Sequence, residues 1–139
     1  MTRFLFAFTL MLFSITAFAV TFKAPSVTKT RGVETIESLV KCVKSGKPET
    51  EVKTCSAKLF AKSLNDKSKV ALLAWLELPL NLAYPEACKS DDVELLPDDQ
   101  LKKASLFLCS KYQLQGLDKQ AIFMMTEEDG QLKLVNIKK

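Results

Sequence analysis

The chain has 139 residues, 47% of them hydrophobic, and its 20 basic and 16 acidic residues give a formal net charge of +4. This length suits one domain with a core of its own. The two signs of charge are interspersed and form no basic stripe, which argues against a nucleic-acid-binding protein. The sequence has no histidine, so it lacks the commonest general acid–base group and metal ligand.

The N-terminus has the three parts of an export signal in the right order. A single positive charge, Arg3, precedes an apolar run over residues 4–18, and small residues flank Phe18 in the segment Ala17-Phe18-Ala19 just before Val20. We therefore predict cleavage between Ala19 and Val20 and a protein that is secreted or located in the bacterial periplasm. The alternative is an uncleaved membrane anchor, because the segment from Phe4 to Phe22 approaches the roughly 20 apolar residues that a spanning helix needs.

The predicted organisation has three parts. Residues 1–19 are the signal peptide, and no membrane span is expected after its removal. Residues 20–31 are polar, contain Pro25 and have no sustained period, which predicts an extended N-terminal arm. Residues 32–139 form a single domain.

All four cysteines follow the signal, and an even number in an exported chain indicates two disulfides. Of the three possible pairings we favour Cys42 with Cys55 and Cys88 with Cys109, because each pair lies in one local supersecondary unit. The cysteine spacings of 13, 33 and 21 residues contain no Cys-x-x-Cys motif. Because the chain also lacks histidine, these spacings argue against a redox-active cysteine pair and against a metal site. We therefore expect no cofactor.

Two amphipathic helices are predicted at the start of the domain. Apolar residues recur at helical spacing from Val33 to Val43, and Ser45-Gly46 ends this helix. A second helix begins near Pro48, which suits a first helical turn. The short connection makes the helices antiparallel neighbours and brings Cys42 near Cys55.

A third helix is predicted after Asn65-Asp66, with Asp66 as its cap, and Pro79 ends it. Its residues 70–76 are apolar nearly all round, which predicts burial on most sides. Trp75 then has two interpretations, the wall of a ligand pocket or partner groove and a filler of the core, and we favour the core.

The segment from Leu80 to Gln100 is broken by prolines, and we expect an ordered loop pinned by Cys88. Its acidic pairs, Asp91-Asp92 and Asp98-Asp99, suggest a calcium site, since several oxygens around a tight turn bind that ion. No EF-hand spacing and no glycine accompany them, so solvated loop and helix-capping roles are favoured.

The last third of the chain has the period of strands. Alternation predicts strands over residues 103–114, 121–127 and 132–137, with a turn at Gly116-Leu117-Asp118. Asp129-Gly130 is a strong hairpin signal between the second and third strands.

If Asp129-Gly130 is a two-residue loop, Met125 faces Leu134 and Met124 faces Val135. Both faces of this hairpin are then partly apolar. One face must lie on the helices, and the other needs either the curled remainder of the sheet or a second subunit. This layout is α+β: about three N-terminal helices packed on a C-terminal antiparallel sheet of at least three strands.

Both ends of the domain resemble those of exported domains with the nuclear transport factor two-like, or cystatin-like, fold. The resemblance lies in residues 34–41 (ETIESLVK) followed by Ser45-Gly46, and in residues 121–125 (AIFMM) followed by 128–134 (EDGQLKL). It implies a cone-shaped pocket between helices and a concave sheet. Members include ketosteroid isomerases and dehydratases, and also exported binding domains without chemistry.

The residues that do acid–base work in such cones are missing here, because the strands offer no histidine and no inward carboxylate. Tyr112 is the only polar-tipped aromatic on a sheet face, and such a tyrosine is more often a core residue. The candidates for ligand or partner contact are Trp75, Tyr112, Phe107 and Met124.

We therefore expect an exported, non-catalytic binding or accessory domain that acts on a protein partner, a small apolar ligand or a second copy through the sheet face. Exported inhibitor and immunity proteins belong to this class. One alternative is a small isomerase- or dehydratase-type enzyme that uses buried carboxylates and Tyr112. Another is a structural component of the envelope.

Overall fold

The computed structural model describes residues 28–139. The predicted signal peptide, its cleavage site between Ala19 and Val20, and residues 20–27 lie outside the described residues. Residues 28–31, which we expected in the arm, belong to a helix over residues 28–44, here called the N-terminal helix. No helix within the described residues is both long enough and apolar enough to cross a membrane.

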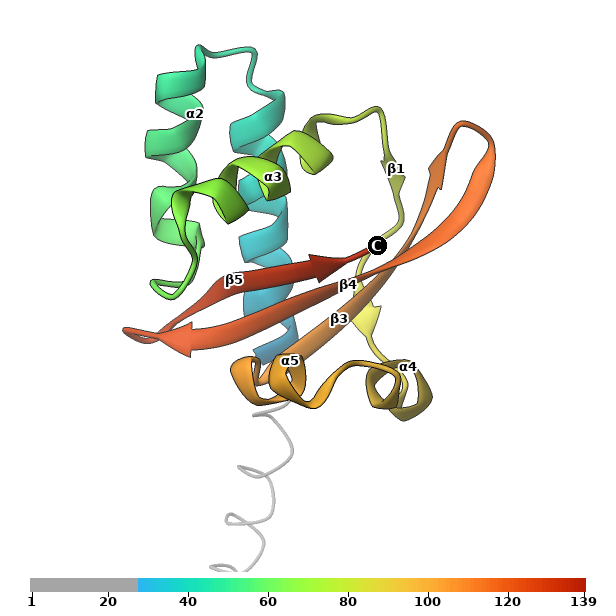
Figure 1. Cartoon of the computed structure of the whole chain (residues 1–139). Helices are drawn as coiled ribbons and strands as arrows, with labels where there is room; N and C mark the ends of the chain where they lie inside the picture. The colour runs from blue at the N-terminus through green and yellow to red at the C-terminus, as the bar shows by residue number, and fades with distance from the viewer. Residues whose placement is uncertain (1–27) are drawn as a thin grey trace, which may run out of the picture.

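The fold is α+β, as predicted: helices form the N-terminal half and a curled antiparallel sheet forms the C-terminal half (Figure 1). The elements after the N-terminal helix are α2 (Glu49–Ser56), the 3-10 turn η1 (Ala57–Leu59), α3 (Asp66–Glu77), β1 (Asn81–Leu82), β2 (Glu86–Ala87), α4 (Ser90–Glu94), α5 (Asp98–Lys103), β3 (Leu106–Leu114), β4 (Leu117–Glu128) and β5 (Gln131–Lys138).

Helix α3 differs from its prediction in its cap and in its burial. The cap is Asn65, whose side chain accepts a hydrogen bond from the Ser68 backbone N–H at 2.8 Å, and not Asp66, which is the first helical residue. Only one stripe of α3 is buried, and Val70 on the other side is 47% exposed. The prediction that α3 is buried on most sides, made from its apolar residues, is therefore wrong. The buried residues are Leu72, Trp75 and Leu76.

The sheet has the order β1-β3-β4-β5, with β2 also paired to β3, and all these pairings are antiparallel. Two-residue turns at Gln115-Gly116 and Asp129-Gly130 join the last three strands. All four turn residues have positive φ, between 52° and 78°, as the hairpin turn of type I′ requires. The Asp129-Gly130 prediction is confirmed, whereas the other turn lies before Leu117, which already opens β4.

A β-bulge divides β5. Met125 faces Leu134 as predicted, but Met124 faces Asn136 and not Val135, because the register shifts between Met124 and Met125. The extra residue on β5 is Val135. Since a bulge reverses the alternation of faces, Leu134 and Ile137 lie on one face of the sheet and Val135 on the other.

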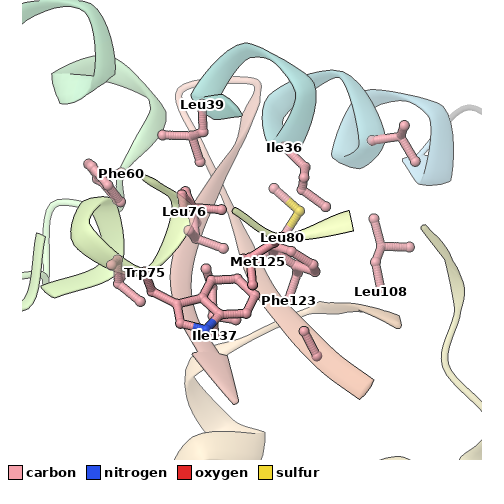
Figure 2. Packing of buried hydrophobic residues seen from close by; sticks show 14 of the residues in the cluster. Ile36, Leu39, Phe60, Trp75, Leu76, Leu80, Leu108, Phe123, Met125 and Ile137 are labelled. Carbon is pink, nitrogen blue, oxygen red and sulfur yellow. The ribbon is translucent and has the colours of Figure 1, made fainter. Parts of the chain in front are cut away.

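The inner face of the sheet packs on the N-terminal helix and α3. Figure 2 shows side chains from both helices and from the strands converging on one apolar layer, here called the inner cluster. Leu39, Leu108 and Phe123 are at most 1% exposed. The inner cluster also contains Val33, Ile36, Phe60, Leu72, Trp75, Leu76, Leu80, Tyr112, Ala121, Met125, Leu132, Leu134 and Ile137.

The outer face is covered by the segment that we expected to be a loop. Residues 80–100 instead contain β1, β2, α4 and the start of α5, and Figure 1 shows α4 and α5 apart from α2 and α3. Apolar residues of this segment, such as Leu96, pack with Met124 in a second, smaller group, here called the outer cluster. The other buried members of the outer cluster are Ala61, Ile122 and Val135.

Both predicted disulfides form. Cys42 of the N-terminal helix is bonded to Cys55 of α2, with a Cα–Cα distance of 5.8 Å. Cys88, just after β2, is bonded to Cys109 of β3, with a Cα–Cα distance of 4.9 Å. One disulfide therefore joins two helices of the inner layer, and the other fixes the start of the outer cover to the sheet.

Candidate functional site

The concave face of the sheet is filled at its centre by aromatic residues. The rings of Trp75 and Tyr112 meet edge to face with centroids 5.4 Å apart, and Phe123 lies 6.3 Å from Trp75. Trp75 is 7% exposed and Tyr112 3%. The structure thus brings together two sequence-predicted candidates, and it places both in the core, with an aromatic geometry that adds to the stability of the packing.

The other two candidates, Phe107 and Met124, lie opposite each other on neighbouring strands of the outer face. Met124 is 1% exposed and Phe107 is half-buried, and both belong to the outer cluster beneath α4 and α5. The outer face at these positions is covered by the chain itself.

An open hollow of about 630 Å³ lies between the N-terminal helix and the segment around β1. We call it the helix–strand groove. Its volume falls within the range of small-molecule sites, roughly 300–1,000 Å³. The floor is made of the buried residues Ile36, Leu80, Ser110 and Phe123. The helix wall consists of Glu37, Val40, Lys41 and Lys44, and the strand wall of residues 81–85.

Hydrogen bonds hold the strand wall in place. The Ala83 backbone N–H donates to the Lys111 carbonyl oxygen at 2.8 Å. The Ser110 hydroxyl, which is 1% exposed, donates to the Ala83 carbonyl oxygen at 2.6 Å. Because the disulfide from Cys88 to Cys109 anchors the chain a few residues later, the wall is attached to β3 at both of its ends.

The charged groups of the groove all stand on its helix wall. Glu37, Lys41 and Lys44 are exposed and recur at helical spacing, so they share one face of the N-terminal helix. Within the described residues, neither lysine takes part in an ion pair. The strand wall is uncharged and ends in Tyr84, which is 61% exposed, and Pro85.

A second depression lies between α2 and α3. It consists of two adjoining hollows of about 310 and 430 Å³, which share Lys53, Val70 and Leu73. Three basic and three acidic residues line it, and Lys53 is already paired with Glu49 at 3.1 Å. This cleft therefore has no net electrostatic preference comparable to that of the helix–strand groove.

The geometry offers little for acid–base or metal chemistry. Apart from the aromatic residues Trp75 and Tyr112, the buried polar residues of the described chain are Thr35, Ser56 and Ser110, and the hydroxyl of each of these three donates to a backbone carbonyl. No group of three or more acidic or cysteine residues within residues 28–139 could hold a metal ion. The acidic pairs of the predicted calcium alternative lie in the first turns of α4 and α5, where carboxylates interact favourably with the positive end of a helix.

One ionisable group away from the groove is electrostatically coupled to its neighbours. The carboxylate of Asp129, 3.0 Å from the Lys62 ammonium, raises the pKa of that lysine above its ordinary value of 10.5, first by hydrogen bonding and then by charge. The Lys62 backbone N–H also donates to the carboxylate of Glu128. These contacts attach the chain after η1 to the β4–β5 turn.

No family model, curated protein or solved structure matches this chain significantly. The nuclear transport factor two-like resemblance thus stays a prediction, and the geometry described above carries the functional argument.

Sequence reasoning did not identify the groove residues. Lys41 and Lys44 lie on the polar side of a predicted amphipathic helix, where lysines usually only interact with solvent. Tyr84 lies in a segment that we expected to be a loop. The signal that could have found them is Tyr84-Pro85, an aromatic residue beside a proline, in a segment held by a cysteine.

Proposed function

We propose that this protein is an exported, non-catalytic binding domain that takes a small apolar ligand in the helix–strand groove. Two features together carry the proposal: the groove is open and has an apolar floor, and no carboxylate within residues 28–139 is buried. Ligand sites are mostly apolar hollows with a few polar groups that fix orientation. Acid–base enzymes instead commonly hold an ionisable group partly buried beside the reacting atoms, whereas the ionisable residues that line the groove are all exposed.

Export is supported by the predicted signal peptide and by two disulfides, which persist in oxidising compartments. The rigid strand wall supports ligand binding in particular. A preorganised site loses less conformational entropy when it binds, so hydrogen bonds at Ala83 favour affinity without touching the ligand.

Binding can be tested with the neutral fluorescent probe N-phenyl-1-naphthylamine. We expect saturable fluorescence enhancement with the unmodified domain. The variant Val40→Glu places a negative charge on the helix wall of the groove. It should weaken probe binding by about tenfold, because an apolar ligand would have to desolvate the carboxylate.

The matched control is Val70→Glu, the same substitution in the cleft between α2 and α3. It should leave the probe affinity unchanged. The proposal is wrong if the unmodified domain shows no saturable binding, or if Val70→Glu weakens binding as much as Val40→Glu does. Far-UV circular dichroism of both variants would verify that they are folded.

A further inference from the structure

The helix–strand groove is polarised along its length. Glu37 stands at one end of the helix wall and Lys44 at the other, roughly 10 Å apart at 1.5 Å per helical residue. Lys41 lies between them, one turn before Lys44. The strand wall carries no charge, so the side chains lining the groove have one negative and two positive groups, and the positive ones are adjacent.

Both ammonium groups are open to an external anion. Both are exposed and, like most lysines of the described chain, neither forms an ion pair within residues 28–139. What distinguishes them is their adjacent position on the wall of a groove with an apolar floor. The end of the N-terminal helix contributes roughly half a negative charge. The two positive charges of Lys41 and Lys44 outweigh this half charge, so the electrostatic potential at this end of the groove is positive.

The apolar floor continues from the lysines into the groove. Val40 and Leu82 are half-buried on opposite walls, and Phe123 lies beneath them at 1% exposed. A ligand with its charge at Lys41 and Lys44 would therefore place its remaining atoms on apolar surface, away from water, where burial is favourable.

We infer that the ligand of the groove is an amphipathic anion, an aliphatic chain with a carboxylate head group of the fatty-acid type. The chain lies on the floor over Phe123, and the carboxylate lies between Lys41 and Lys44. This inference rests on the proposed function, because it names the chemical class of the ligand that the same groove binds.

The test is displacement of N-phenyl-1-naphthylamine by decanoate and by 1-decanol, which share a chain length and differ in charge. We expect decanoate to bind the unmodified domain more tightly than decanol. In the double variant Lys41→Gln/Lys44→Gln, decanoate affinity should fall about fivefold, since two partly exposed ion pairs are lost, while decanol affinity stays the same.

The matched control is Lys102→Gln/Lys103→Gln on α5, which removes the same net charge from residues that do not line the groove. It should leave decanoate affinity unchanged. Equal affinities of decanoate and decanol, or an equal loss in both double variants, would overturn the anion inference while probe binding still supports the proposed function. Absence of probe binding would overturn both proposals.

Discussion

The two faces of the sheet are buried in different ways. The inner face lies under long helices and carries the larger cluster, with Trp75 and Phe123 near its centre. The outer face lies under α4 and α5, helices of five and six residues that contain no fully buried residue. Helices this short are not stable alone. The outer cover therefore depends on the disulfide at Cys88 and on contacts with the sheet, whereas the inner layer is held by its own packing.

The largest expected effect is a loss of stability on truncating two neighbouring residues that point to opposite faces of the sheet. Phe123→Ala should lower the free energy of unfolding by about 3–5 kcal/mol, and Met124→Ala by about 2 kcal/mol, because α4 and α5 can shift to fill the smaller void. Both residues are 1% exposed, so burial alone does not separate them. Urea unfolding measures the difference, and a loss at Met124 as large as that at Phe123 would mean that α4 and α5 do not shift to fill the void.

Removal of each disulfide sharpens the comparison. Loops of 13 and 21 residues each correspond to about 3 kcal/mol on the chain-entropy estimate. Cys88→Ser/Cys109→Ser should also speed hydrogen exchange in α4 and α5 selectively, whereas Cys42→Ser/Cys55→Ser should not. Uniform loss of protection in both variants would contradict an outer cover that depends on its disulfide.

A smaller effect is expected at the hydroxyl that holds the groove wall. Ser110→Ala should cost about 1 kcal/mol, since the Ala83 carbonyl loses its hydrogen-bond donor, and should weaken probe binding in the groove. Ser56→Ala is the control, because that equally buried hydroxyl donates to Val52 within its own helix. If both variants bind the probe alike, the wall needs no such support.

The smallest expected effect is the pH dependence of the pair at the edge of the outer cluster. Since Asp129 raises the pKa of Lys62, the pair contributes fully to stability below the ordinary lysine value of 10.5, and the contribution is lost as the pH rises through the folded value. The gap in melting temperature between the unmodified domain and Lys62→Gln should therefore be small at pH 9 and shrink further by pH 11. A gap that widens over this range would show that Lys62 acts in another way.

Local signals predicted much of this fold. The Asp129-Gly130 turn, both disulfide pairs and the order of helices before strands follow from turn chemistry, cysteine arithmetic and periodicity. These features depend on residues that are close in sequence. That is why the predictions made from a single chain are confirmed at these positions.

The features that were missed depend on distant residues. The bulge at Val135 arises because β5 supplies apolar residues to both clusters, and no local pattern announces it. The short helices α4 and α5 are stabilised by packing of their apolar residues on the outer face of the sheet, which is distant in sequence. The groove lies between Lys41 and Tyr84, residues 43 positions apart that only the tertiary fold brings together.

The connectivity of the disulfides bears on how the protein reaches its oxidised state. Cys42 pairs with Cys55 and Cys88 with Cys109, so the two bonded loops follow one another along the chain without overlap. In a chain that crosses a membrane with its N-terminus first, an oxidant that joins cysteines in their order of emergence produces this pairing directly. Such a chain reaches its native bonds without the slow exchange of partners that interleaved disulfides require.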